Sequence, residues 1–452
     1  MKAKYYKLQF LGLILLSATM VFNTSCEEEV NENYQVDAAN PEFLHRSMKR
    51  LTDVIVHDIF SPPVASRIYS YPSIAAYEIL ALNDPNYQSL SGQIKHLGAI
   101  PKPKADYEYC HALASVHAFL TVGKKLIFSE EKIESFQEEI YQEFKDIKIP
   151  KQAYENSITY GDAVAKYIIE WASQDNYNQT RTFPKFDVNL DDDTRWQPTP
   201  PDYMEGIEPH WNKIRPFVLD SAKQFQPDFP TQYSMDKNST FYKELMEVYD
   251  TGVNLDTAQE AIAKFWDCNP YVSNHHAHLM FATKKITPGG HWINITSIAT
   301  RQKKSSLIQS AEAYTMVSIS LMDAFISCWD EKYRSNLIRP ETVINKFIDE
   351  DWKPLLQTPP FPEYTSGHSV ISSAAAVTLT KLYGDNFAFL DTSEEEYGLP
   401  PRYFNSFIEA SEEAAISRLY GGIHYMPAID NGVTQGRRLG RFILGRVVTR
   451  KG

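Results

Sequence analysis

Two cations in the last third of the chain are the first residues whose spacing suggests chemistry. Lys332 and Arg339 stand seven positions apart, which is about two turns of an α-helix, so both would project from one helical face. Pro340 follows directly and ends or kinks that helix. Two cations on one side suit the recognition of an oxyanion. Taken alone, the same pattern is more typical of a solvated basic face.

A second segment joins a proline-rich loop to the start of a helix. Thr365 and Ser366 follow the loop and are typical N-cap residues for the Ala/Ser/Val-rich helix that comes next. Gly367 and His368 then lie at the helix N-terminus, where unpaired N–H groups and the helix dipole attract anions. The alternative interpretation is a capped helix with an incidental histidine.

A third segment ends a helix and carries a histidine. Ser417 and Arg418 precede the glycine pair 421–422, which breaks the helix, and His424 follows that break. A histidine just past a helix end, with an arginine six positions before it, can line a pocket. By itself this motif is weak, because helix C-termini favour arginine and histidine in any case.

Together the three segments resemble the signature of the superfamily that contains the type 2 phosphatidic-acid phosphatases and the vanadium haloperoxidases. The family pattern reads K-x6-R-P, then P-S-G-H, then S-R-x5-H, and here Thr365 replaces the proline of the second element. Trp329 and Phe361 stand where haloperoxidase-like sequences have aromatic residues. Residues 288–292, which include His291, look like the segment that precedes the site in bacterial members. We therefore expect His291, Trp329 and Phe361 in the pocket.

The resemblance implies a vanadate cofactor, for which phosphate competes, and neither a nucleotide cofactor nor a divalent metal. His424 would hold vanadate through a ring nitrogen, and His368 would act as acid and base while bound peroxide oxidises a halide. The small-molecule substrates would be peroxide and halide. The other signature residues would hold the oxygens of the oxyanion: Lys332, Arg339, Ser366, Gly367 and Arg418.

The same set of residues leaves two alternatives open. In a phosphatase acting on a phosphate ester, His424 would attack phosphorus and His368 would protonate the leaving alcohol. The other alternative is a non-catalytic surface lipoprotein on the same scaffold, because the family usually places an aspartate four positions after the second histidine and this chain has Ala428 there. We expect Asp430 to orient His424 in its place.

Two further clusters resemble metal sites less closely. His275, His276 and His278 would suit zinc if they shared a helical face, but histidines at the rim of a pocket are the commoner case. Residues 191–193 are consecutive aspartates without the alternate spacing of a calcium loop, which indicates a solvated acidic loop.

The first residues look like a targeting segment. Residues 1–25 resemble a bacterial lipoprotein signal peptide, with a basic start and an apolar stretch shorter than the ~20 residues of a membrane span. Cys26 would then carry the lipid, and the acidic residues 26–42 would form a tether. This pattern predicts an exported protein, lipid-anchored at the cell envelope in the outer membrane or at the cell surface. The alternative is ordinary secretory cleavage nearby.

The elements that position the motifs have a helical pattern. Of 452 residues, 43% are hydrophobic and 23% charged, which is typical of a globular protein, and a formal charge of −12 argues against nucleic-acid binding. Apolar residues recur at helical spacing while alternating strand patterns are scarce. The strongest predicted helices are 43–60, 73–82, 107–128, 130–144, 154–172, 255–265, 306–330, 366–382 and 406–420.

These helices predict an all-α protein built from helical bundles of the vanadium haloperoxidase and acid phosphatase type, with long proline-rich loops. We place an N-terminal helical region at 43–235, with a long loop at 174–230, and a C-terminal helical catalytic domain at 236–452. A loop of that length is often functional. The resemblance also allows a homo-oligomer, since haloperoxidase relatives include dimers and larger assemblies.

Overall fold

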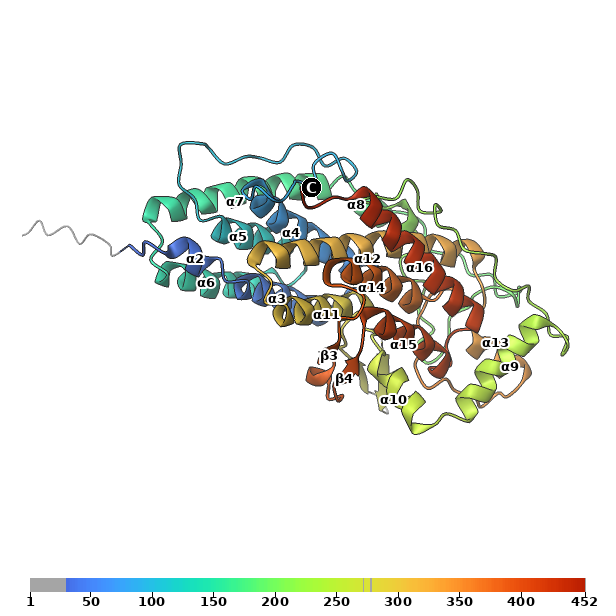
Figure 1. Ribbon diagram of the computed structural model, residues 1–452. Coiled ribbons are helices and arrows are strands. Elements are labelled where there is room, and N and C mark those ends of the chain that lie inside the picture. Colours follow the sequence, from blue (N-terminus) through green and yellow to red (C-terminus); the bar gives the residue numbers. More distant parts are fainter. Residues whose placement is uncertain (1–29, 271, 277–278, 452) are drawn as a thin grey trace, which may run out of the picture.

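The protein is a bundle of α-helices with two small β-hairpins, as a computed structural model shows (Figure 1). The structure describes residues 30–270, 272–276 and 279–451, and within them the all-α prediction is confirmed. The helices of the N-terminal half are α2 (Tyr34–Ala38), α3 (Glu42–His57), α4 (Pro62–Leu82), α5 (His111–Lys124), α6 (Glu130–Asp146), α7 (Lys151–Ala172), α8 (Tyr177–Thr180) and the 3-10 turn η1 (Trp211–Lys213).

The C-terminal half adds the remaining helices and both hairpins. The helices are α9 (Thr240–Val253), α10 (Thr257–Phe265), α11 (Pro288–Gln302), α12 (Leu307–Ser335), α13 (Pro340–Phe347), α14 (Gly367–Tyr383), the 3-10 turn η2 (Glu395–Tyr397), α15 (Phe407–Tyr420) and α16 (Met426–Arg446). The antiparallel hairpins pair β1 (Val272–His276) with β2 (Leu279–Thr283), and β3 (Phe389–Asp391) with β4 (Arg402–Phe404).

Helix α12 runs through the middle of the bundle (Figure 1). Its residues are apolar or small on nearly every side, which is typical of a buried helix, and it packs against α4, α11, α14 and α16. A capping box between Ser306 and Gln309 begins the helix, and Asn336 in the left-handed conformation ends it. One continuous apolar core joins α12 to helices on both sides of residue 235.

Helices α14 and α16 approach each other closely because glycines of α16 face α14. A Cβ atom added at Gly436 would lie 2.2 Å from the carbonyl oxygen of Val370, so no larger residue fits there without moving a backbone. Ser366 is the N-cap of α14, as predicted, and its hydroxyl accepts a hydrogen bond from Ser369 N at 3.3 Å. Helix α16 therefore supports the half of α14 that carries the Ser-Gly-His segment.

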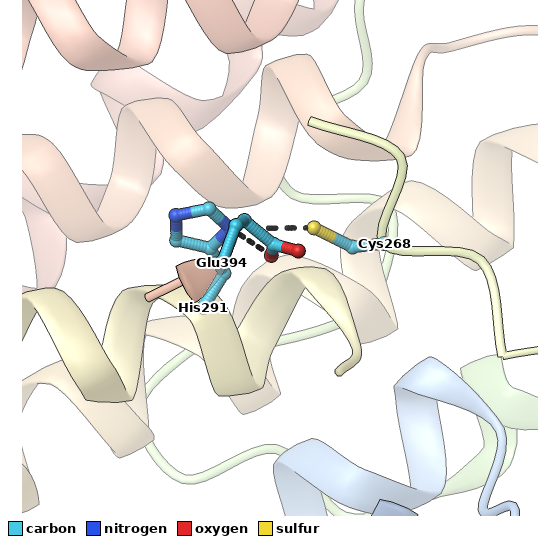
Figure 2. A group of neighbouring side chains, drawn as sticks. All are labelled: Cys268, His291 and Glu394. Atoms are coloured by element: carbon cyan, nitrogen blue, oxygen red, sulfur yellow. Dashed lines mark hydrogen bonds and ion pairs between the residues drawn. The ribbon is translucent and has the colours of Figure 1, made fainter. Parts of the chain in front are cut away.

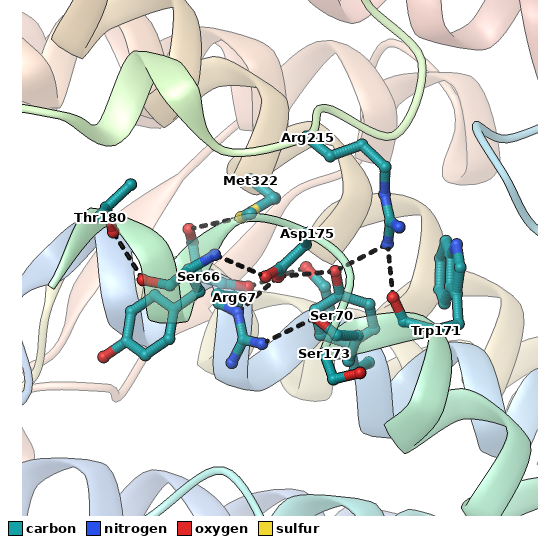
Figure 3. Close-up of polar contacts among 12 residues, drawn as sticks. Ser66, Arg67, Ser70, Trp171, Ser173, Asp175, Thr180, Arg215 and Met322 are labelled. Carbon is teal, nitrogen blue, oxygen red and sulfur yellow. Dashed lines mark hydrogen bonds and ion pairs between the residues drawn. The ribbon is translucent and has the colours of Figure 1, made fainter. Parts of the chain in front are cut away.

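A buried ion network anchors the start of the segment 174–230 (Figure 3). Asp175 accepts hydrogen bonds from Arg67 Nε at 2.6 Å and from the Tyr71 hydroxyl at 2.8 Å, both on α4. Arg215, further along the segment, donates to the Tyr71 hydroxyl at 3.2 Å and to the carbonyl of Trp171 at 3.1 Å. The segment is irregular apart from α8 and η1, and these contacts hold it against the bundle.

A second buried carboxylate anchors the same segment to α12. The two carboxylate oxygens of Asp323 accept hydrogen bonds from the backbone N–H groups of Phe217, Val218 and Leu219 at 2.7, 2.8 and 3.0 Å. Burial raises the pKa of Asp323 to about 6, although the three N–H groups act in the opposite direction. Three consecutive backbone donors on one carboxylate fix the path of an otherwise irregular chain.

The Arg67–Asp175 pair gives a test of this anchoring. Asp175→Asn leaves the buried Arg67 guanidinium without its anion, so we expect the free energy of unfolding to fall by ~3–5 kcal/mol. Glu205→Gln is the matched control, because its ion pair with Lys185 is exposed and is worth less than ~1 kcal/mol. Chemical denaturation followed by circular dichroism measures both, and equal effects would contradict the anchoring role.

Two sequence predictions about local structure are wrong. Lys332 and Arg339 do not share a helix, because α12 ends at Ser335 and Arg339 is the N-cap of α13. Asn336 reverses the chain in the left-handed region, and Pro340 begins a new helix at the position where its missing N–H is tolerated. Helix α4 begins well before residue 73 and contains Pro72 in its interior.

His275 and His276 lie on strand β1, not on the helix that the zinc interpretation assumed. His278, the third histidine of that cluster, lies outside the described residues. The predicted signal segment and Cys26 lie outside the described residues as well.

No helix in the described part of the chain is both long and apolar enough to cross a membrane. The structure also contains helices α9, α11, α13 and α16, which were not among the strongest helices predicted from the sequence.

Candidate active site

The three signature segments meet at the N-terminus of α14. Residues 336–340 connect α12 to α13, residues 359–366 lead into α14, and residues 421–425 connect α15 to α16. Hydrogen bonds join these connections directly: Arg339 Nε donates to the carbonyl of Phe361 at 2.9 Å, and Arg339 Nη1 donates to the carbonyl of Ile423 at 2.8 Å. Three loops from separate parts of the chain thus form one site.

His424 is oriented by a carboxylate that the sequence did not single out. Its Nδ1 lies 2.8 Å from Glu363 Oε1, which also accepts the backbone N–H of Tyr425 at 3.0 Å. Because a carboxylate accepts, Nδ1 carries the proton and Nε2 keeps its lone pair. That lone pair faces Arg339 Nη1 at 3.2 Å. Nε2, the ring nitrogen without a proton, is therefore the atom that would bond to vanadium or phosphorus in place of this contact with Arg339.

The expectation that Asp430 orients His424 is corrected by this geometry. Helix α16 begins at Met426, so Asp430 lies on its exposed side, while Ala428 is buried and its carbonyl accepts the N–H of Ser366 at 3.0 Å. Glu363 reaches the ring from the loop before α14 instead. Its signal in the sequence was a single carboxylate within an otherwise proline-rich and apolar loop.

Three buried cations surround the histidine. Lys332, Arg339 and Arg418 expose at most 2% of their surface. Burial lowers the pKa of Lys332 to about 7 and the pKa of Arg339 and Arg418 to about 10. Among the described residues, the carboxylate closest to His424 is Glu363, whose own pKa burial raises to about 7. The cluster therefore carries an excess of positive charge that an oxyanion offsets.

The cations are held by backbone carbonyls, which fixes their directions. Lys332 Nζ donates to the carbonyls of Pro362 and Glu363 at 3.0 Å each, and Arg418 Nη2 donates to the carbonyl of Trp266 at 2.8 Å. These donors are pre-organised by the fold. Ordering them on ligand binding therefore costs little free energy.

A small cavity opens onto these residues. Its volume is about 40 Å³, and its walls include Gly367, His368, Arg418, His424 and the aromatic pair of Trp329 and Phe361. A space of this size admits a small ion or a few water molecules but no large organic molecule. The predicted positions of Trp329 and Phe361 thus coincide with the cavity wall, whereas Lys332, Arg339 and Ser366 are not among its lining residues.

His368 offers a second ring nitrogen to the cavity. Its Nε2 is buried and has no hydrogen-bond partner among the described residues. Burial, followed by the charge of Arg418, lowers the pKa of His368 well below its ordinary value, so the ring is neutral at pH 7. A neutral imidazole with a free nitrogen suits proton transfer to and from a ligand in the cavity.

The aromatic wall interacts with the cations as well. The rings of Trp329 and Phe361 lie with their centroids 5.0 Å apart. Lys332 Nζ lies 5.0 Å and Arg339 Cζ lies 5.1 Å from the Phe361 ring centroid, which are cation–π distances. Phe361 therefore steadies two buried cations at the same time.

His291, expected in the pocket, does not line it. The residue is fully buried in the first turn of α11, and its Nε2 lies 2.8 Å from Asp391 Oδ2. Its other nitrogen faces Cys268, whose side chain does line the cavity. His291 thus stands one layer behind the wall.

The fold is a helical bundle, and the site places a histidine and buried cations where an oxyanion would fit. Residues 312–450 match the family model described as the VCPO second helical-bundle domain. The chain is 55% identical to the protein in "Crystal structure of the first bacterial vanadium dependant iodoperoxidase", covering 91% of this chain and 97% of that one with a TM-score of 0.87. The chain belongs to the vanadium-dependent haloperoxidase family.

More distant structures share the fold. A holo-type bacterial vanadium-dependent chloroperoxidase is 15% identical, with a TM-score of 0.66 over 93% of this chain and 96% of that one. An apo-type bacterial vanadium-dependent chloroperoxidase, also 15% identical, has a TM-score of 0.65 over 85% and 94% of the two chains. The comparison with curated proteins found no match.

The residues present fit vanadate. His424 offers one nitrogen lone pair, and the surrounding cations offset the charge of the oxyanion. The unpartnered Nε2 of His368 is buried beside it. Asp267 also lines the cavity, where its carboxylate forms an ion pair with Lys285.

The orienting role of Glu363 is tested by Glu363→Gln. The amide no longer fixes the proton on Nδ1, so we expect vanadate affinity or turnover to fall ~10–100-fold. Asp430→Asn is the control and should leave both unchanged, because Asp430 does not contact the ring. Steady-state kinetics and a vanadate titration measure both variants. A larger loss in Asp430→Asn than in Glu363→Gln would show that Asp430, not Glu363, orients His424.

The buried lysine predicts a pH dependence of oxyanion binding. The pKa of Lys332, lowered to about 7, means that the side chain is charged below pH 7 and neutral above it. At pH 6 the unchanged protein should therefore bind inorganic phosphate at least ~10-fold more tightly than the Lys332→Met variant does. By pH 9 the two affinities should be nearly equal. Calorimetric titration of both proteins measures this ratio, in which the titration of phosphate itself cancels. A ratio independent of pH would show that Lys332 stays charged.

Proposed function

We propose that this vanadium-dependent haloperoxidase is an iodoperoxidase, which oxidises iodide with hydrogen peroxide. The observation that carries the proposal is the Nε2 lone pair of His424, directed by Glu363 into a buried cluster of cations. The choice of iodide is supported by the 55% identity to the protein described as an iodoperoxidase. Iodide is also the halide that is easiest to oxidise among chloride, bromide and iodide.

The chain's own side chains have separate tasks in this reaction. Vanadate, when bound, supplies a Lewis acid that makes hydrogen peroxide electrophilic toward halide. His424 Nε2 holds the cofactor, while Lys332, Arg339 and Arg418 offset negative charge on its oxygens. His368 Nε2 is placed to accept a proton from incoming peroxide and to return it to the departing oxygen.

Glu363 also weakens the case for an inactive scaffold. That alternative depended on Ala428 standing where the family has an aspartate. Because Glu363 contacts Nδ1 at 2.8 Å, the ring keeps a fixed orientation without that aspartate.

Iodide oxidation by the purified chain tests the proposal. With orthovanadate, peroxide and iodide we expect turnover that falls at least ~100-fold in His424→Ala and is unchanged in His57→Ala, an exposed histidine at the end of α3. Bromide in the same assay should react more slowly than iodide. Faster bromide turnover would overturn the halide assignment, and phosphate-ester hydrolysis that needs His424 but no vanadate would favour the phosphatase alternative.

We also propose that the protein is exported and anchored by a lipid on Cys26. The support is the sequence of residues 1–26 alone, which has the order of a lipoprotein signal. The Cys26→Ser variant should move the protein from the membrane fraction to the soluble fraction, and mass spectrometry of the mature N-terminus should find the lipid. A homo-oligomer stays a prediction, which sedimentation of the mature protein measures.

A further inference from the structure

Three metal-ligating side chains, Cys268, His291 and Glu394, form a buried cluster (Figure 2). Cys268 follows α10, His291 lies in the first turn of α11, and Glu394 precedes η2. All three are buried, and their ligand atoms lie within 4.8 Å of one another. We propose that Cys268, His291 and Glu394 form a binding site for a divalent transition metal of the zinc type, distinct from the vanadate site.

The separations of the ligand atoms suit tetrahedral coordination. Cys268 Sγ lies 3.4 Å from His291 Nδ1, and Glu394 Oε1 lies 3.1 Å from the same nitrogen. Zinc with bonds of ~2.3 Å to sulfur and ~2.1 Å to nitrogen and oxygen places sulfur and nitrogen roughly 3.6 Å apart, and nitrogen and oxygen roughly 3.4 Å apart. Two of the three separations are therefore within a few tenths of an ångström of those in a zinc site, and the third, between Cys268 Sγ and the Glu394 carboxylate, is at most 4.8 Å.

His291 is held in the orientation that a metal ligand requires. Its Nε2 lies 2.8 Å from Asp391 Oδ2, and Asp391 Oδ1 accepts the N–H of Ser393 at 3.0 Å. The indole of Trp266 stacks on the imidazole with ring centroids 4.5 Å apart and planes 20° apart. A carboxylate on the far nitrogen fixes a proton there, so metal binding would release the proton on Nδ1 and turn its lone pair toward Cys268 and Glu394, an arrangement common around zinc.

Hydrogen bonding within the cluster does not satisfy all of its polar atoms. Glu394 Oε1 is buried and has no hydrogen-bond partner among the described residues, although Nδ1 of His291 is 3.1 Å away. A single ring nitrogen faces both a thiol and a carboxylate, and it cannot serve both with one proton. A cation at the centre would satisfy all three atoms at once.

The charge balance points the same way. Two buried carboxylates, Asp391 and Glu394, share one imidazole, and among the described residues no lysine or arginine forms an ion pair with either of them. The protonated imidazole offsets only one of the two charges, and burying the other carboxylate without a cation is costly. A divalent ion, with the Cys268 thiolate as a further ligand, offsets this negative charge.

The site would tie three segments together next to the cavity. Cys268 lines the cavity that also contains His368 and His424, so the fourth coordination position would fall to solvent from that side. A metal-bound thiolate there joins the segment after α10 to α11 and to the loop after β3. The His424 site needs none of these ligands.

Metal binding by the full-length protein without vanadate tests the assignment. After chelator treatment and dialysis, we expect about one equivalent of Zn²⁺ to bind per chain, and Co²⁺ in its place to give the absorption of a thiolate-to-metal charge transfer. Zinc in excess should raise Tm by roughly 2–5 °C, and a chelator should reverse this.

Variants distinguish this site from adventitious binding. Cys268→Ser should abolish the charge-transfer band, and Glu394→Gln, which keeps the shape, should weaken Zn²⁺ binding at least ~10-fold. The control is Cys110→Ala, which removes a buried cysteine at the N-cap of α5. This variant should bind Zn²⁺ as the unchanged protein does. Less than about a tenth of an equivalent of Zn²⁺ in the unchanged protein, or a charge-transfer band that persists in Cys268→Ser, would overturn the proposal.

Discussion

The site depends on one buried carboxylate placed among buried cations. Glu363 accepts from the ring of His424 and from the N–H of Tyr425 through its side chain, while its backbone carbonyl accepts from Lys332. Its backbone N–H also donates to the carbonyl of Leu337 at 3.0 Å, so a single residue connects all three loops. Removing cations from water is expensive, and one carboxylate offsets only part of that cost. The fold supplies the rest through carbonyl contacts and through the ring of Phe361, which lies against both Lys332 and Arg339.

Helix packing explains why such a cluster keeps its shape. The loop that carries Glu363 runs into α14, and α14 is held by α12 on one side and by the glycines of α16 on another. At Gly436 the two backbones come so close that a side chain would displace Val370. The long irregular segment covers the other flank of α12, where Asp323 fixes it through backbone N–H groups. The loops of the site are therefore supported by rigid elements.

Much of this arrangement could be predicted from the sequence, because local rules govern it. The helical pattern, the Ser366 cap and the break after Arg418 follow from spacing and residue type. What could not be predicted depends on contacts between distant residues. Glu363 meets His424 across about sixty residues of chain, and His291 meets Asp391 across about a hundred. The prediction that Lys332 and Arg339 share a helical face was wrong for a local reason. Asn336 adopts a left-handed conformation that ends the helix, and the residues around it do not indicate this in the sequence.

The excess positive charge at His424 has a consequence for the lifetime of the protein before it acquires its cofactor. Any tetrahedral oxyanion that enters the cluster binds the folded chain and not the unfolded one, so it shifts the folding equilibrium toward the native state. Phosphate, which is also a tetrahedral anion of nearly the same shape as vanadate, would act as a placeholder. Newly folded chains would then be protected from proteolysis by an abundant ion until a scarce one replaces it.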